Sequence, residues 1–209
     1  MRLFHYHLVT SELRRVEAHY VGRLGFRLVA RHGRVGDSQT SFEAGTSWEE
    51  LDGIGFKLRL SELEHGAVNV VVQPGHWRVP RVDHLGFALD EDEFRRVLEH
   101  ATERKLRVQE HGGRRTFIAT NAGYRLEVHP PRDWIDALLD DAGTLQIAEL
   151  HLRSDEPEEK ARVLAELLDL PHWETDVQIE SSIVRFVPGG PEGRPELHAE
   201  RFKGVGSEA

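Results

Sequence analysis

The sequence contains no cysteine, which excludes disulfide bonds, thiolate metal sites and a cysteine nucleophile. Basic residues are outnumbered, with 27 Lys and Arg against 36 Asp and Glu and a formal net charge of −9. That balance argues against nucleic-acid binding through a general basic field. No apolar run approaches the roughly 20 residues needed to cross a bilayer. We therefore expect neither nucleic acid nor a membrane as a partner.

The N-terminal residues 1–7 have no apolar core and no cleavage site of the kind that marks a secretory signal. The expectation is therefore a cytoplasmic protein. Histidine, by contrast, is plentiful, with 13 among 209 residues. In the absence of cysteine, histidine, aspartate and glutamate are the residues available for acid–base chemistry and for metal binding.

Three stretches of the chain share one order of elements: an alternating apolar strand, an acidic turn, an amphipathic helix and further short strands. The first strands are expected at 4–9, 82–89 and 147–152. We expect β-α-β-β-β modules over 1–78, 79–140 and 144–209, with junctions at 73–80 and 140–143. Because an odd number of modules leaves the third without a partner in the chain, we also expect a homodimer.

One such module cannot cover both faces of its sheet. Pairing modules solves this by forming a curved, partly closed mixed sheet, or cup, with helices on the convex side. The predicted fold class is therefore α+β, with a concave face lined by alternate strand residues. The segment 45–64, which holds Trp48, Gly53 and Gly55, is expected to be loop and short structure at the rim.

Strand alternation predicts which side chains line the cup. The apolar set, which includes Phe4 and Tyr124, is expected to pack beneath the helices. The opposite set holds the polar residues of these strands, together with Val9, Gly86 and Ala88. The polar members are His5, His7, His84, Arg125, Glu127 and His129.

Three residues of that polar set, His5, His84 and Glu127, come from three different strands and could converge on one point. Two neutral imidazoles and one carboxylate are the ligands of a facial triad, which leaves three coordination positions open and suits Fe(II) or Mn(II). An isolated histidine on a strand is more often a hydrogen-bonded polar residue. The repeat-equivalent positions of His5 and His84 favour the metal hypothesis.

The sequence around these residues resembles the vicinal oxygen chelate superfamily, which includes glyoxalase I, the fosfomycin and bleomycin resistance proteins and the extradiol dioxygenases. The match rests on His5, on 11–12 and 20–26, on 84–89 and on 121–127, and it covers residues 1 to about 130. The resemblance implies paired modules and a divalent metal held by His5, His84 and Glu127.

The sequence departs from the glyoxalase pattern at the fourth ligand. Aligning 73–74 with 129–130 places Val71 opposite Glu127. A one-step error in this register would make Asn69 or Gln73 the candidate for the fourth ligand. Three ligands resemble the extradiol dioxygenases, which use Fe(II), and the fosfomycin thiol transferases, which use Mn(II). Fe(II) is the favoured cofactor, with Mn(II) or another divalent ion as alternatives.

The first functional hypothesis is a metal-dependent enzyme, glyoxalase-like or extradiol-dioxygenase-like, that acts on a small substrate chelating the metal through neighbouring oxygens. The three-ligand count favours a dioxygenase slightly. The candidates for proton transfer near the metal are His7, His111, Tyr124 and His129. Tyr124 has the least support, because alternation places it beneath the helix.

Two alternatives belong to other classes. One is a non-catalytic binding protein of the bleomycin-resistance type, whose cup would hold a small hydrophobic or aromatic ligand with Trp48, Trp77 and Trp134 near its rim. The other is a thiol transferase or lyase. In the third module, Glu149 stands where the first-strand histidine would be, and Glu196 and His198 are expected to correspond to Glu127 and His129. Together with His151, these residues could form a second carboxylate–histidine cluster. The simpler interpretation is a degenerate module that shields a sheet edge or makes a dimer contact.

Overall fold

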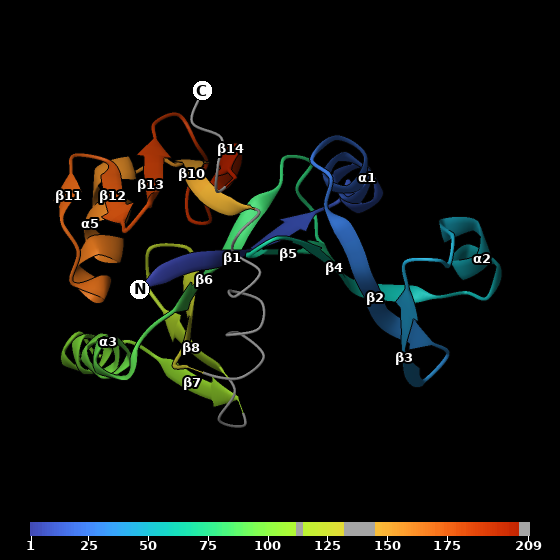
Figure 1. Ribbon diagram of the computed structural model, residues 1–209, viewed down its shortest axis with the longest axis horizontal. Helices are drawn as coiled ribbons and strands as arrows, with labels where there is room; N and C mark the ends of the chain where they lie inside the picture. Colours follow the sequence, from blue (N-terminus) through green and yellow to red (C-terminus); the bar gives the residue numbers. More distant parts are fainter. Residues whose placement is uncertain (112–114, 132–144, 205–209) are drawn as a thin grey trace.

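The computed structural model describes residues 1–111, 115–131 and 145–204, so the expected junction at 140–143 lies outside the described residues. The fold is α+β, and a mixed, curved and open sheet dominates it (Figure 1). The β2–β3 hairpin and α2 lie at one end of the sheet and the C-terminal strands at the other, with β1 and β6 between them (Figure 1).

The first group of elements falls within residues 1–78. It comprises β1 (Arg2–Thr10), α1 (Leu13–Arg23), β2 (Arg27–Val35), β3 (Ser38–Glu43), α2 (Trp48–Gly53), β4 (Lys57–His65) and β5 (Val68–Pro74). The expectation of loop and short structure over 45–64 is wrong in its second half, where β4 pairs with both β2 and β5. The three leucines of β4 do not keep one alternation, because the register with β2 shifts between Leu58 and Leu60, and this hid the strand.

The second group comprises β6 (Arg81–Ala88), α3 (Glu91–Glu103), β7 (Val108–His111), β8 (Arg115–Ala119) and β9 (Arg125–His129). α3 begins with a capping box, in which Asp90 and Glu93 each accept a hydrogen bond from the other's backbone N–H. β6 runs antiparallel to β1 and parallel to β9, so it joins the first group to the second.

The third group comprises β10 (Gln146–Arg153), α5 (Pro157–Leu168), β11 (His172–Trp173), β12 (Asp176–Ile179), β13 (Ser182–Val187) and β14 (Glu196–Lys203). β13 is parallel to β10, as β9 is to β6. β14 is antiparallel to β10, as β6 is to β1. β14 therefore corresponds to the first strand of a module, and the expected correspondence of Glu196 and His198 with Glu127 and His129 is wrong.

The seam between β1 and β6 holds two β-bulges. The register shifts once between Leu3 and His5 and once between His7 and Leu8, which leaves Phe4 in β1 and Asp83 in β6 as the extra residues. Each bulge is followed directly by a histidine, so His5 and His84 occupy equivalent positions. A bulge interrupts alternation, and Phe4 accordingly lines the cup instead of packing beneath the helix as expected.

The core lies on the convex side of the sheet. Helix α1 buries Leu13, Val16 and Tyr20 and contacts β4 and β5, as its apolar spacing predicts. Helix α5 contacts β12 and β13, and α3 packs against α5. Within the described residues, no helix is long and apolar enough to cross a membrane.

Candidate metal centre

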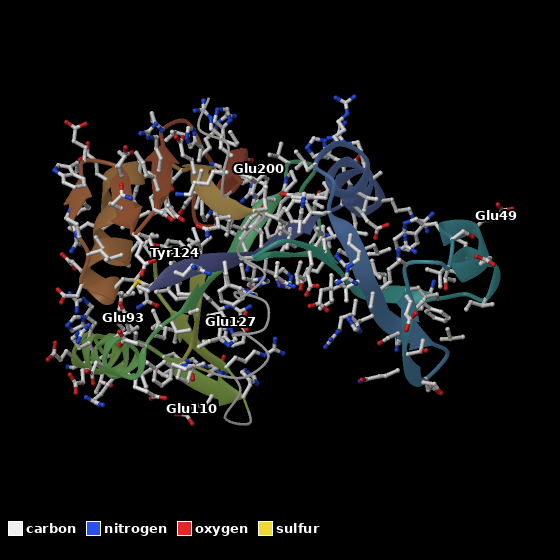
Figure 2. The ribbon with its side chains drawn as sticks, in the orientation of Figure 1. Glu49, Glu93, Glu110, Tyr124, Glu127 and Glu200 are labelled. Atoms are coloured by element: carbon white, nitrogen blue, oxygen red, sulfur yellow. The ribbon has the colours of Figure 1, made fainter. Side chains whose placement is uncertain are left out.

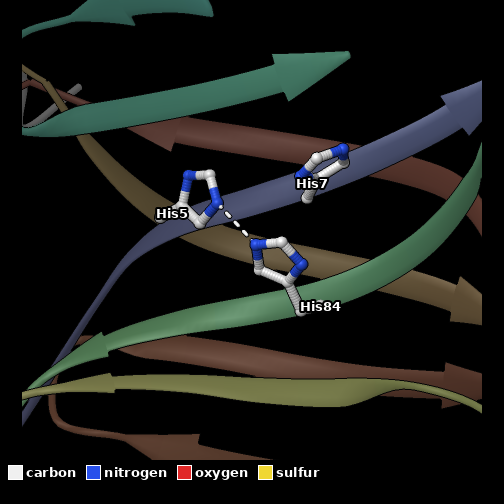
Figure 3. Close-up of side chains that lie close together, drawn as sticks. All are labelled: His5, His7 and His84. Atoms are coloured by element: carbon white, nitrogen blue, oxygen red, sulfur yellow. Dashed lines mark hydrogen bonds between the residues drawn. The ribbon is translucent and has the colours of Figure 1, made fainter. Parts of the chain in front are cut away.

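Two histidines from neighbouring antiparallel strands face each other across the β1–β6 seam. The Nε2 atoms of His5 and His84 lie 3.1 Å apart, and both side chains are buried (Figure 3). The third expected ligand, Glu127, lies on β9, where it pairs with Gly86 of β6. The fold therefore brings together the three residues that the sequence pattern places on the concave face.

The Glu127 carboxylate completes the cluster. Its Oε2 lies 2.8 Å from Nε2 of His84 and 3.7 Å from Nε2 of His5. In an octahedral site with metal–ligand bonds near 2.1 Å, adjacent ligand atoms are about 3 Å apart. The three separations are thus close to those of one face of an octahedron.

Hydrogen-bond partners outside the cluster, here called outer partners, determine which imidazole nitrogens face the cluster. The Asn69 amide donates a hydrogen bond to Glu62, so its Oδ1 is free to accept from Nδ1–H of His5, at 2.7 Å. Nδ1–H of His84 donates to Oδ2 of Asp83 at 2.8 Å. Such partners are typical of metal-binding histidines, because they fix the tautomer and direct the other nitrogen towards the metal.

These hydrogen bonds leave two imidazole lone pairs and one carboxylate oxygen of Glu127 pointing at one another. All three side chains are at most 6% exposed, so water does little to screen the repulsion. A positive charge between the three atoms is therefore required. A divalent cation would satisfy all three at once, so the donor set, its spacing and its outer partners fit a metal ion.

The charges around the cluster favour the ionised form of Glu127 and of its neighbour Asp83. Burial by itself would raise the pKa of Glu127, but its close contacts with His129, His84 and His5 hold it well below its usual range. The pKa of Asp83 is likewise lowered in spite of burial, by His84 and by Arg125, which forms a short ion pair with it. Both carboxylates are ionised at neutral pH.

Burial acts in the opposite sense on the histidines, because it disfavours their charged form. It lowers the pKa of His5 to about 4, against the opposing charge of Glu127. It also lowers the pKa of His7 well below its usual value, with a further contribution from His84 and His5. Both rings are therefore neutral at pH 7, as metal ligation requires. Nitrogen atoms of His5, His7 and His84 all lie within 4.8 Å of one another, a group that could hold a metal ion (Figure 3).

His129 lies beside the cluster, as expected, and its role is visible in its contact. Its Nε2 lies 3.1 Å from Oε1 of Glu127, the oxygen that faces away from the two histidines. Arg115 approaches the same oxygen at 3.6 Å from the rim. These contacts fix the carboxylate so that Oε2 is presented to the histidines.

Two of the expected proton-transfer residues lie elsewhere. His111 is exposed, and its ring contacts Phe117, which in turn packs against His84, so His111 is one ring removed from the cluster. Tyr124 is buried on the convex side, where its hydroxyl donates to the backbone oxygen of Lys160, and burial raises its pKa further (Figure 2). Tyr124 is not part of the site.

The cluster opens into a cavity of about 270 Å³. Besides the cluster, its walls include Phe4, Phe117, Arg59 and Val71. Its volume is at the lower end of the range for small-molecule sites. The mixture of aromatic and cationic side chains suits a small polar molecule.

Sequence comparisons leave the chain unassigned, because no family model matches it and no curated protein is significantly similar to it. Solved structures do resemble it. A mutant of 4-hydroxymandelate synthase from Streptomyces coelicolor superimposes with a TM-score of 0.63 at 13% identity, over 96% of this chain and 70% of that one. A variant of homoprotocatechuate 2,3-dioxygenase from B. fuscum gives 0.59 at 13% identity, over 97% and 56%.

A third solved structure, the Mn(II)-bound glyoxalase from Novosphingobium aromaticivorans, gives a TM-score of 0.54 at 11% identity, over 94% of this chain and 63% of that one. The protein has the vicinal oxygen chelate fold. Its chain spans less than two thirds of the length of the glyoxalase and of the homoprotocatechuate dioxygenase. At these identities the likeness concerns the fold.

Within this vicinal oxygen chelate fold, two residues support the metal-facing histidines that strand alternation in the sequence did not identify. They are Asp83, which was not placed on the cup, and Asn69, which was not recognised as a hydrogen-bond partner of His5. The bulge at Asp83 turns its carboxylate to the same side as the adjacent His84, whereas regular alternation would have directed it away. The sequence signal that could have identified Asp83 is an aspartate placed directly before a candidate ligand. Asn69 was considered only as a ligand, and the structure shows it holding His5 instead.

The third group does not reproduce the centre. Its bulges lie at 148 and 198, so Glu149 and Ala199 occupy the positions of His5 and His84. Glu149 is bonded to His151 at 2.7 Å and lies near Arg201. Within the described part of the third group, no three histidine or carboxylate side chains come close enough together to hold a metal.

Tryptophans do not line the cup among the residues that the structure describes. Trp48 is sandwiched by Arg14 and Arg31, and Trp77 is covered by Arg81. Trp134 lies outside the described residues. The aromatic lining expected for a metal-free binding protein is thus not provided by Trp48 or Trp77.

Proposed function

We propose that the protein is a metal-dependent enzyme whose divalent ion is held by His5, His84 and Glu127. The observation that supports this most strongly is the convergence of three buried acceptor atoms within 2.8–3.7 Å. Their outer partners Asn69 and Asp83 direct the lone pairs inward. Such an arrangement costs stability unless a cation lies between the acceptors.

The proposed substrate is a small molecule that offers two neighbouring oxygens to the metal. The bound ion would act as a Lewis acid on those oxygens. Among the chain's own residues, His129 keeps Glu127 in its ligating orientation. Arg59, which lines the cavity, supplies positive charge for an anionic substrate group. Phe4 and Phe117 supply an apolar wall for a planar part of the substrate.

With His5, His84 and Glu127 as the three protein ligands, the proposed reaction is of the dioxygenase type with Fe(II), and Mn(II) is the alternative ion. A ligand set of two histidines and one carboxylate leaves three positions on an octahedral ion, two for substrate oxygens and one for dioxygen. Several structural neighbours are dioxygenases, which is consistent with this proposal. A redox-neutral reaction of the glyoxalase type would need only two open positions. The number of protein ligands therefore distinguishes the two.

The test is to load the chelator-treated protein with Fe(II) or Mn(II) under anaerobic conditions and to follow two readouts. Oxygen uptake is measured on a panel of catechols, and isomerisation or adduct formation is measured on α-hydroxy- and α-ketocarbonyl compounds. We expect turnover with loaded wild-type protein and none with Glu127→Gln. If both metal forms are inert on every compound while an aromatic ligand binds regardless of chelator, the protein is a binding protein instead.

A further inference from the structure

His7 is a buried histidine beside the candidate metal centre, and one of its ring nitrogens lacks a hydrogen-bond partner among the residues that the structure describes. It is 8% exposed, and among the described residues its Nε2 has no hydrogen-bond partner. A buried polar atom without a partner is uncommon and needs a physical reason. The outer partners that hold His5 and His84 have no counterpart at His7, so its position has a different basis.

The position of His7 places it within reach of the same ion. In the β1–β6 register it pairs with His84, and one of its nitrogens lies within 4.8 Å of nitrogens of His5 and His84 (Figure 3). Around an octahedral ion with bonds near 2.1 Å, ligand atoms are about 3 Å apart when adjacent and about 4.2 Å when opposite. The separations among the three histidines therefore exceed the spacing of opposite ligands by at most about 0.6 Å.

The pseudo-symmetry of the two modules indicates which ligand is missing. In the second group His84 pairs with Arg125, and Glu127 follows two residues later on β9. In the first group His5 pairs with Asn69, and Val71 stands at the position that corresponds to Glu127. The sequence alignment that places Val71 opposite Glu127 is thus confirmed by the strand register.

Val71 has no donor atom, and the first group therefore lacks the carboxylate that its symmetry mate provides. Val71 is the β1–β5 register partner of His7, so the two residues lie side by side on the cup. The imidazole of His7 stands next to the place where the symmetric carboxylate would be.

We propose that His7 is the fourth protein ligand, so that the ion is held by three imidazoles and one carboxylate. This inference rests on the proposed metal function. Four protein ligands leave two positions on an octahedral ion, enough for two neighbouring oxygens of a substrate. Dioxygen would then have no position of its own. His7 as a ligand would therefore replace the dioxygenase reaction of a three-ligand site by the redox-neutral one, with an imidazole-preferring ion such as Ni(II), Zn(II) or Fe(II), while the metal-dependent function itself stays the same.

The experiment counts the imidazoles on the metal without using activity. The protein is loaded with cadmium-113, and proton–cadmium correlation spectra are recorded, in which each coordinated imidazole gives its own cross-peaks. We expect three coordinated imidazoles in the wild-type protein and two in His7→Phe. We also expect His7→Phe to bind the ion at least 10-fold more weakly. His19→Phe, an exposed helical position, is the matched control and should retain all three.

Affinity alone would not identify a ligand, because loss of an outer partner also weakens binding by roughly 10- to 100-fold. The imidazole count separates the two roles. A wild-type count of two that is unchanged in His7→Phe would overturn the assignment of His7 and leave the proposed function intact. Failure of the wild-type protein to bind cadmium, zinc or manganese would overturn both.

A second pair of variants guards against simple misfolding of His7→Phe. His7→Val removes the imidazole, and Val71→Glu added to it restores a fourth donor at the symmetric position. We expect the double variant to bind cadmium at least 10-fold more tightly than His7→Val, with two coordinated imidazoles. Equal affinities for the two variants would contradict the positional argument.

Discussion

The carboxylate of Asp83 links the metal-facing histidine to two arginines. It accepts from Nδ1 of His84 and pairs with Arg125 and Arg194. Asp83→Asn keeps the shape but weakens the acceptor that fixes the imidazole. We expect metal affinity to fall roughly 10- to 100-fold, measured by titration calorimetry with Mn(II). An affinity within twofold of wild type would show that Asp83 does not orient His84.

Protonation of His5 couples the centre to folding stability. Burial lowers the pKa of His5 to about 4 from an ordinary value of 6.5, so between these values the unfolded chain binds more protons than the folded one. Stability is therefore greatest above pH 6.5 and is lost as the pH falls towards 4, by on the order of 3 kcal/mol. Urea unfolding of chelator-treated protein from pH 7 to 4.5 measures this. His5→Gln should flatten the dependence, and an unchanged slope would contradict the assignment.

Much of the site was predictable residue by residue, because alternation in three short strands places His5, His7, His84, Glu127 and His129 on the cup. Each of these lines the cavity. Alternation failed at the bulges, where one extra residue reverses the direction of the side chain. The outer partners also escaped prediction, since their roles depend on contacts between strands that are far apart in the sequence.

Among the strands, the β1–β6 seam requires a residue without a side chain at Gly86. A Cβ added there would lie 2.7 Å from Cβ and 2.9 Å from Cδ2 of His5, closer than such atoms approach. Gly86→Ala should therefore displace His5, weaken metal binding and destabilise the fold by about 1–3 kcal/mol.

Manganese titration and thermal unfolding test this expectation for Gly86→Ala. Gly53→Ala in α2 is the matched control, because a Cβ there meets nothing within 4 Å. Comparable metal affinities for the two variants would show that the seam tolerates a side chain at Gly86.

The helices and most strands followed from periodicity, whereas β4 did not. Its buried face carries Ser61 and Leu63 beneath α1, whereas Leu60 and Glu62 line the cup. The three leucines at 58, 60 and 63 do not keep one alternation, because the register with β2 shifts between Leu58 and Leu60. Pairing with β2 and β5 forms it, and pairing partners distant in sequence are not visible in a local pattern.

At the scale of the whole molecule, the third group packs against the second and stabilises it. The Tyr124 hydroxyl donates to the backbone of Lys160 in α5, and its ring packs near Phe186. Tyr124→Phe should lower the free energy of unfolding by about 1 kcal/mol while leaving metal affinity unchanged. Chemical denaturation and a manganese titration on the same sample measure both. A loss of metal affinity would place Tyr124 in the site after all.

The three-module organisation was visible in the sequence as a repeat, but the role of β14 was not. Its equivalence to β6 depends on strand direction and on a shared pair of bulges, both of which are properties of pairing. The homodimer expected from an odd module count stays a prediction. Analytical ultracentrifugation would show it as a mass twice that of the 23.8 kDa chain.

The central claim is that His5, His84 and Glu127 hold a divalent metal. The most direct test is the metal content of untagged protein purified without chelator or oxygen, by inductively coupled plasma mass spectrometry, for wild type and His84→Ala. The account predicts close to one divalent transition-metal ion per chain in the wild type and almost none in His84→Ala. Wild-type protein that holds no metal even after reconstitution, or a His84→Ala variant that keeps its full content, would contradict it.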